Sequence, residues 1–169
     1  MTEKQQNAVK KIIADLPPDY QGIYREIAEH AISLGYLPSL KGAQGQYVIF
    51  NKNFPKCKTN RTILKIVADH KQKNYSMETR FFANKSYSPF FEKAIDLRLS
   101  YNFDTDHGCS NCGKCDGTQG YYYKTSDGER KFICGFVSLI QLPLVQAENI
   151  SEIKDALTRQ DDLYVRLYG

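Results

Sequence analysis

Four of the five cysteines in this chain fall within residues 109–134 and constrain how that part can fold. Cys109, Cys112 and Cys115 are spaced at intervals of three, and Cys134 follows nineteen residues after the last of them. Thiolates at this spacing can converge on one ion, and a set of four suits Zn²⁺ or an iron–sulfur cluster. The first three are too close together to satisfy disulfide geometry among themselves. We therefore predict that these four residues bind one structural zinc ion, with an iron–sulfur cluster as the alternative.

The stretch from His107 to Gly117 resembles a zinc-ribbon knuckle, in which a Cys-x-x-Cys-Gly sequence makes a tight turn around the metal. The resemblance covers about residues 107–135. It is partial, because a ribbon has a second Cys-x-x-Cys and this chain has only Cys134. The run is also similar to bacterial ferredoxins, which continue with a fourth cysteine and a proline that are missing here. His107 is an alternative ligand in place of Cys115.

A β-hairpin is predicted to bring Cys134 to the other cysteines. Residues 121–125 and 130–140 have the composition of strands, and Asp127-Gly128 between them is typical of a two-residue turn. Such a turn places Cys134 opposite Tyr121, six residues after the last cysteine of the cluster. The knuckle and Cys134 can then meet at the open end of the hairpin.

The remaining patterns predict an α+β fold: an antiparallel sheet with flanking helices plus a small metal-stapled C-terminal lobe. The expected elements are a helix at about 3–15 with a capping box at Thr2 and Gln5, a second helix from Asp19 to Gly35, a strand at 46–50, a hairpin of 61–70 and 75–83, a helix from Ser88-Pro89, and a last helix capped by Asn149. We expect residues 1–100 to form an α+β domain of two helices, three strands and a helix. Residues 101–169 should form the cysteine metal-binding lobe, with the hairpin and the C-terminal helix, and pack with the first part as one unit.

The composition favours a globular cytoplasmic protein. The apolar share of 41% is enough for an ordinary core, and no apolar run approaches the ~20 residues of a membrane span. The polar start is not a signal peptide, and a cluster of free cysteines suits a reducing compartment.

The middle of the chain is basic, with eleven Lys and Arg against four Asp and Glu in residues 51–100. Lys71, Lys73, Arg80 and Lys85 are interleaved with aromatic residues, and such a pattern can offer charge and stacking to nucleic acid. The same pattern is also typical of a half-exposed sheet with lysines outside and aromatics inside. We predict an anionic partner for this basic face, with nucleic acid as one candidate.

Three function classes follow from these residues. The first is a non-enzymatic binding or regulatory module with structural zinc, and the second is an iron–sulfur redox protein on the same cysteines. The third is a small enzyme, for which Asp104, Asp106 and His107 are the candidate acids and bases. The two lysines that flank Cys57 could make this thiol reactive, but a plain exposed thiol is the favoured interpretation. No hydrolase, metalloprotease or deaminase motif is present, which favours the binding module.

Overall fold

The computed structural model describes residues 1–57, 60–100, 119–124, 130–135 and 139–169. Within these ranges the chain is α+β, with an antiparallel sheet and four α-helices, in agreement with the predicted fold class. The elements are α1 (Glu3–Ala14), α2 (Pro18–Ser33), β1 (Leu37–Lys41), β2 (Tyr47–Lys52), β3 (Arg61–Asp69), β4 (Asn74–Thr79), α3 (Pro89–Ser100), β5 (Gly120–Lys124), β6 (Arg130–Cys134), β7 (Ile140–Gln141), a 3₁₀ turn (Ala147–Asn149) and α4 (Ile150–Tyr168).

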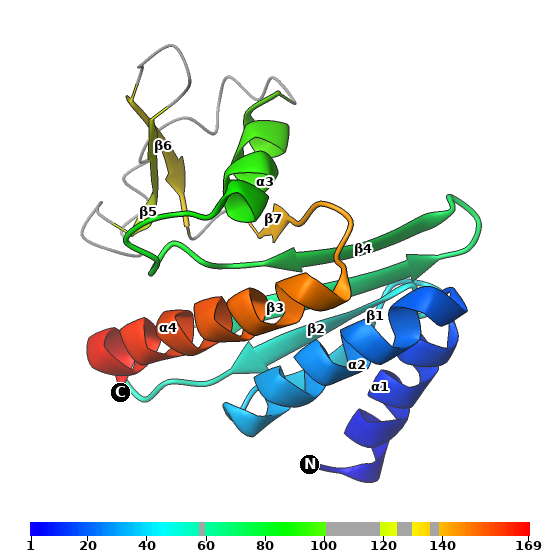
Figure 1. Cartoon of the computed structure of the whole chain (residues 1–169). Helices are drawn as coiled ribbons and strands as arrows, with labels where there is room; N and C mark the ends of the chain where they lie inside the picture. The colour runs from blue at the N-terminus through cyan, green and yellow to red at the C-terminus, as the bar shows by residue number, and fades with distance from the viewer. Residues whose placement is uncertain (58–59, 101–118, 125–129, 136–138) are drawn as a thin grey trace.

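Five strands form one antiparallel sheet in the order β1-β2-β3-β4-β7, with β1 and β7 at its edges (Figure 1). The sequence predicts only the three central strands. β1 was not expected because it contains Pro38, which is tolerated on an edge strand and rarely elsewhere in a sheet. β7 has two residues, and its Ile140 pairs with Thr79 of β4. The predicted strand at 130–140 is therefore wrong in its second half, since β6 ends at Cys134 and Ile140 belongs to the main sheet.

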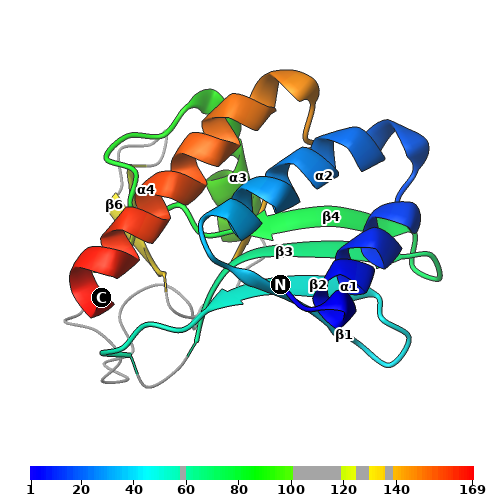
Figure 2. The ribbon, with the colours of Figure 1, turned by 90° about the horizontal axis from the view of Figure 1, so that it is seen from below.

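Helices α1, α2 and α4 lie on one face of this sheet (Figure 2). Alternate side chains of a strand point to the same face, and Val48, Phe50, Leu64, Ile66 and Met77 of the central strands are buried beneath the helices. The helices contribute apolar side chains that are equally buried, among them Ile12, Ile27, Ala31, Ile153 and Leu157. The core therefore lies between the sheet and these three helices.

The predicted helix starts are correct for α1 and wrong for α2. Thr2 Oγ1 accepts a hydrogen bond from the Gln5 amide, and the Thr2 amide donates to Gln5 Oε1 at 2.7 Å, so the capping box is confirmed. Helix α2 begins at Pro18, and no side-chain bond caps it, so Asp19 is not its cap. Gly35 follows α2 with φ +90°, as expected of a glycine that ends a helix.

Strands β5 and β6 form a separate two-stranded sheet that lies beside α3 (Figure 1). Gly120 pairs with Cys134 and Tyr121 with Ile133, so the predicted pairing of Tyr121 with Cys134 is wrong by one position. The prediction assumed a two-residue turn, whereas the observed register leaves residues 125–129 between the strands. Cys134 still lies at the open end of the hairpin, opposite its first residue.

The last helix, α4, packs against α2 and β3, so the end of the chain completes the layer that begins with α1. Ile153, Leu157 and Tyr164 are buried, whereas Leu167 is 38% exposed. The metal-stapled part of the predicted lobe falls within 101–118, outside the described residues. No helix in the described ranges is both long and apolar enough to cross a bilayer.

Candidate functional site

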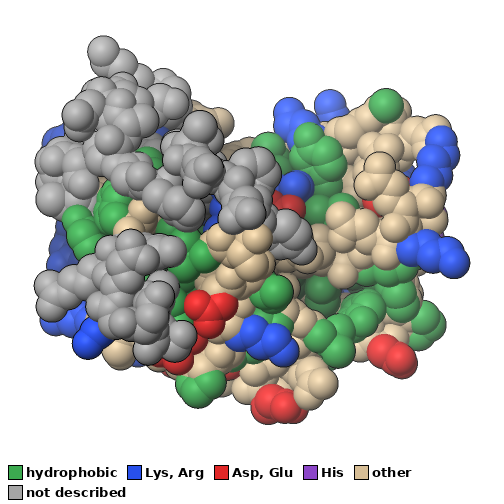
Figure 3. Space-filling model, turned by 90° about the horizontal axis from the view of Figure 1, so that it is seen from above, with side chains coloured by type: hydrophobic (Ala, Val, Ile, Leu, Met, Phe, Trp, Pro, Cys, Tyr) green, Lys and Arg blue, Asp and Glu red, His purple; other side chains and the backbone are tan. Residues whose placement is uncertain are grey.

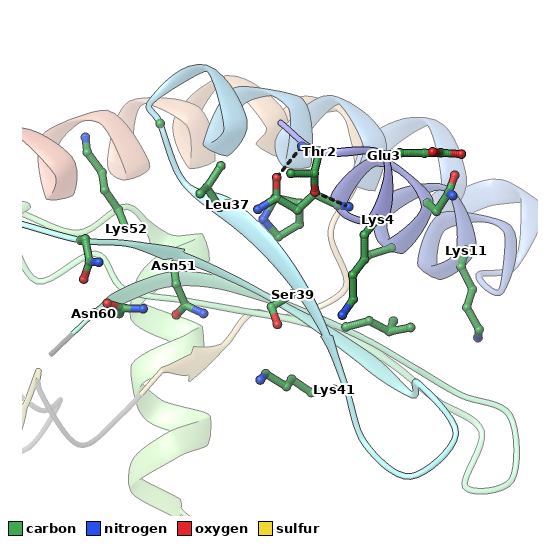
Figure 4. Close-up of a pocket in the computed structure, with 17 residues that line it drawn as sticks. Thr2, Glu3, Lys4, Lys11, Leu37, Ser39, Lys41, Asn51, Lys52 and Asn60 are labelled. Carbon is green, nitrogen blue, oxygen red and sulfur yellow. Dashed lines mark hydrogen bonds between the residues drawn. The ribbon is translucent and has the colours of Figure 1, made fainter.

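A groove of about 1330 Å³ lies between helix α1 and the edge strand β1 (Figure 4). Its lining comprises Thr2, Glu3, Lys4, Gln5, Asn7, Ala8 and Lys11 of α1 and its cap, Gly35, all five residues of β1, and Asn51, Lys52, Asn53 and Asn60. The groove is thus formed by one helix wall and one strand wall.

The helix wall is set by the amphipathic pattern of α1. Ile12 and Ile13 are buried, and Ala8 is 6% exposed, so this side of the helix is fixed on the sheet. Lys4 and Lys11 are seven residues apart, which is about two helical turns, and therefore stand on one face. In Figure 4 the Lys4 side chain points from α1 towards β1. The capping box holds the first turn in place beside the groove.

The strand wall is the outer edge of β1. This strand pairs with β2 on one side, and none of the described strands pairs with its other side. Pro38 and Leu40 lie opposite Phe50 and Val48, so their side chains are on the helix-covered face. Lys41 is on the opposite face, and Figure 4 shows it on the far side of β1 from Lys4.

The groove has an excess of positive charge, since four lysines line it against one glutamate. Two of these lysines have partners: Lys11 Nζ lies 2.6 Å from Asp15 Oδ2, and Lys52 Nζ lies 2.8 Å from Asp161 Oδ1. None of the described carboxylates forms an ion pair with Lys4 or Lys41. These two ammonium groups, one on each side of β1, are therefore available to an anionic ligand.

Lys52, at one end of the groove, is a structural cation. Its Nζ donates to the Leu34 carbonyl at 2.7 Å as well as to Asp161, and it stands 5.3 Å from the centre of the Tyr36 ring. Burial raises the pKa of Tyr36 far above its usual range, and the charge of Asp161 adds to this effect. The ion pair of Lys52 and Asp161 joins the end of β2 to α4, so ligand binding is left to the other lysines of the groove.

The structure describes only part of the predicted metal site. Cys134 is a free thiol, 5% exposed, at the end of β6. Cys109, Cys112 and Cys115, together with the alternative ligand His107, lie outside the described residues, as do the candidate acids Asp104 and Asp106. Whether the four cysteines share an ion stays a prediction, which metal analysis of the purified protein can test. Cys57 is a half-buried free thiol, and its amide donates to the Phe54 carbonyl at 2.9 Å.

The four predicted nucleic-acid contacts lie at opposite ends of β4. Lys71 and Lys73 are exposed in the β3–β4 turn, whereas Arg80 and Lys85 follow the other end of the strand, about 20 Å away by the rise of a strand. Arg80 Nε donates to the Gly135 carbonyl at 2.8 Å, which ties β4 to the end of the hairpin. Seen from above, described Lys and Arg side chains are scattered over the molecule and form no continuous patch (Figure 3). The structure therefore does not bring the four residues together.

The groove was missed in the sequence because its strand wall was not recognised. The apolar positions of α1 were sufficient to assign Lys4 and Lys11 to its outer face. However, the Pro38 of β1 removed the alternating signal that would have placed Lys41 on a strand beside them. An edge strand such as β1 therefore has to be inferred from two weak signs. One is its own irregular pattern, and the other is that the predicted strand Gln46 to Phe50 had no partner strand at this edge.

No family model, no curated protein and no solved structure matches this chain. The predicted resemblance of residues 107–135 to a zinc ribbon is contradicted by this absence of a match and by the side chains that the structure describes. Among the described residues, no group of three or more His, Cys, Asp and Glu side chains is placed to hold a metal ion. The physical reason for the error is that short Cys-x-x-Cys spacing reports only local turn geometry and not the fold around it.

Proposed function

We propose that this chain is a non-enzymatic binding module and that the groove between α1 and β1 binds an anionic partner. The observation that carries the proposal is the pair Lys4 and Lys41, which line one large groove from the two sides of β1 without a carboxylate partner among the described residues. In this proposal the basic face contains Lys4 and Lys41, which lie outside the basic residues 51–100.

The chemistry of the lining supports binding over catalysis. Its described side chains are amides, hydroxyls, lysines, one glutamate and a few aliphatic groups. A hydrolytic or transfer site usually places a nucleophile next to a base, or a His or carboxylate with a shifted pKa. Ser39 has no His, Asp or Cys beside it in the lining, and the Thr2 hydroxyl is engaged by the Gln5 amide.

Charge reversal tests the proposal. In the full-length protein, Lys4→Glu with Lys41→Glu should weaken the binding of a fluorescein-labelled acidic peptide, followed by fluorescence anisotropy at 50 mM salt. Each reversal replaces an attraction by a repulsion, and a contact at about 4 Å is worth about 1 kcal/mol even in water, so we expect at least a tenfold loss. Raising the salt to 500 mM should weaken the wild-type complex as well, because exposed charges are screened.

The matched control is Lys10→Glu with Lys93→Glu, which changes the net charge equally. Lys10 lies on α1 and Lys93 on α3, both exposed and both outside the groove lining. If both double variants lose affinity equally, the binding reflects net charge alone and the groove is not the site. Failure of the wild-type protein to bind any acidic probe would also refute the proposal.

A further inference from the structure

The outer edge of β1 offers backbone groups as well as charge. In an antiparallel ladder, each residue directs its N–H and C=O either towards its partner strand or away from it. A proline in a sheet normally has its nitrogen directed away from the ladder, since it cannot donate. Pro38 and Leu40, two positions apart, should therefore direct their backbone outwards into the groove. This leaves the Leu40 amide and the Pro38 and Leu40 carbonyls to receive another strand.

From this geometry we infer that the anionic partner is an extended acidic peptide that adds a sixth strand at the edge of β1. The inference rests on the proposed function and specifies its ligand. Edge-strand addition is a common mode of peptide recognition, in which the main chain provides affinity and alternate side chains provide specificity. The five residues of β1 span about 17 Å, so a peptide of about five residues covers the edge.

The positions of the lysines fit the alternation of such a peptide. Consecutive side chains of the added strand point to opposite faces of the sheet. Lys4 lies on the helix side of β1 and Lys41 on the other side (Figure 4). Two adjacent acidic residues can therefore each reach one lysine. Leu37 and Leu40, which are 47% and 36% exposed, supply apolar contacts for the flanking residues.

The same lining is poorly suited to nucleic acid. None of its seventeen described residues is aromatic, so no base can stack on them, and none is an arginine, the residue that binds phosphate in a bidentate manner. Its amide and hydroxyl side chains, such as Asn7, Asn51 and Ser39, instead complement the N–H and C=O groups of a peptide. The observations thus favour a peptide as the source of the negative charge.

The decisive experiment changes the peptide and leaves the protein intact. The probe is an eight-residue peptide with two adjacent glutamates between valine and threonine residues. Two isomers carry N-methyl groups on alternate amides, one set at the odd and one at the even positions. Only one set can face β1, so we expect one isomer to bind at least tenfold more weakly and the other to bind nearly as well as the parent. The two isomers have the same charge, length and composition and control each other.

Amide hydrogen exchange gives a second, residue-specific result. On saturation with the parent peptide, exchange at the Leu40 amide should slow at least tenfold. The amide of Ser39, which faces β2 in the same ladder, should change little. Equal exchange at Leu40 with and without peptide would overturn strand addition.

The outcomes separate this inference from the proposed function. If both N-methylated isomers bind as the parent does, or both fail equally, strand addition is wrong, while a groove that binds acidic groups still stands. If an oligothymidylate of twelve nucleotides binds more tightly than the peptide and its binding is weakened by Lys4→Glu, the partner is nucleic acid and the inference fails. If no acidic probe binds at all, both the inference and the proposed function are wrong.

Discussion

The two edges of the five-stranded sheet differ in length, in cover and in chemistry. At one edge, β7 contributes only two residues, and helix α3 packs against it. At the other edge, β1 contributes five residues, all of which line an open groove. Proteins commonly shorten or cover an edge strand, because unpaired backbone groups would otherwise recruit another chain.

At the β7 edge the surrounding side chains form part of the core. Ile140 and Leu142 are 0% and 4% exposed, and Phe91 and Ile95 of α3 are buried beside them. At the β1 edge Leu37, Leu40 and Lys41 are exposed, and among the described residues Pro38 and the lysine charge are what opposes unspecific pairing. The first edge is thus part of the core, whereas the second is exposed.

Truncation at the two edges should therefore have very different costs. Ile140→Ala removes a fully buried side chain, and we expect about 3 kcal/mol of lost unfolding free energy from the lost burial and the cavity. Leu40→Ala, at a position that is 36% exposed, should cost less than about 1 kcal/mol of unfolding free energy. It should instead weaken the binding of the acidic peptide. Urea unfolding of both variants checks this. Equal destabilisation by the two changes would contradict the contrast between the edges.

The hairpin next to the covered edge allows a smaller and more specific test. The Tyr121 hydroxyl accepts a hydrogen bond from the buried Phe81 amide at 3.2 Å, and its ring packs at 4.9 Å from the Phe81 ring. Tyr121→Phe leaves that amide without its acceptor, so we expect about 1.5 kcal/mol of destabilisation. The neighbouring Tyr122 is 62% exposed, and Tyr122→Phe should change stability by less than about 0.5 kcal/mol. Neither variant should alter peptide affinity. A loss of binding in Tyr121→Phe would show that the two edges of the sheet are coupled.

The sequence predicted best the elements whose signal is local and repeated. The capping box of Thr2 and Gln5 and the buried side of α4, with Ile153 and Leu157, could be identified because each depends on residues a few positions apart. The β3–β4 hairpin was found for the same reason, and Lys65 and Glu78, which lie opposite each other in it, form an ion pair at 2.7 Å.

The sequence failed where long-range pairing decides the structure. β7 is too short to have a pattern of its own and exists only because β4 offers a partner, so Ile140 was assigned to the hairpin. The hairpin register was wrong by one because the length of the turn, and not the alternation, sets which residue lies opposite Cys134. The candidate groove depends on Lys4 and Lys41, which are 37 positions apart, and no local pattern could relate them.

The smallest expected effect is a pH dependence of stability that peptide binding should not share. His30 lies between α2 and α4, where its Nε2 is 2.9 Å from Thr158 Oγ1 and 3.1 Å from the Lys154 carbonyl. Burial is the largest influence and lowers the pKa of His30; the hydrogen bond to Lys154 opposes it, and the charge of Lys154 adds to it. The unfolded chain therefore binds a proton more readily, so stability is retained above about pH 6.5 and falls as the pH drops below it.

Because the His30 ring is partly exposed to solvent, we expect its contribution to the unfolding free energy to change by at most about 0.5 kcal/mol between pH 7.5 and 5.5. Urea unfolding of wild type and His30→Gln measures this change as the difference between the two proteins. No described residue of the groove is a histidine, so peptide affinity should stay constant from pH 8 to 6 while this difference develops. A rise in wild-type stability relative to the variant as the pH falls would reverse the sign of the argument and refute it.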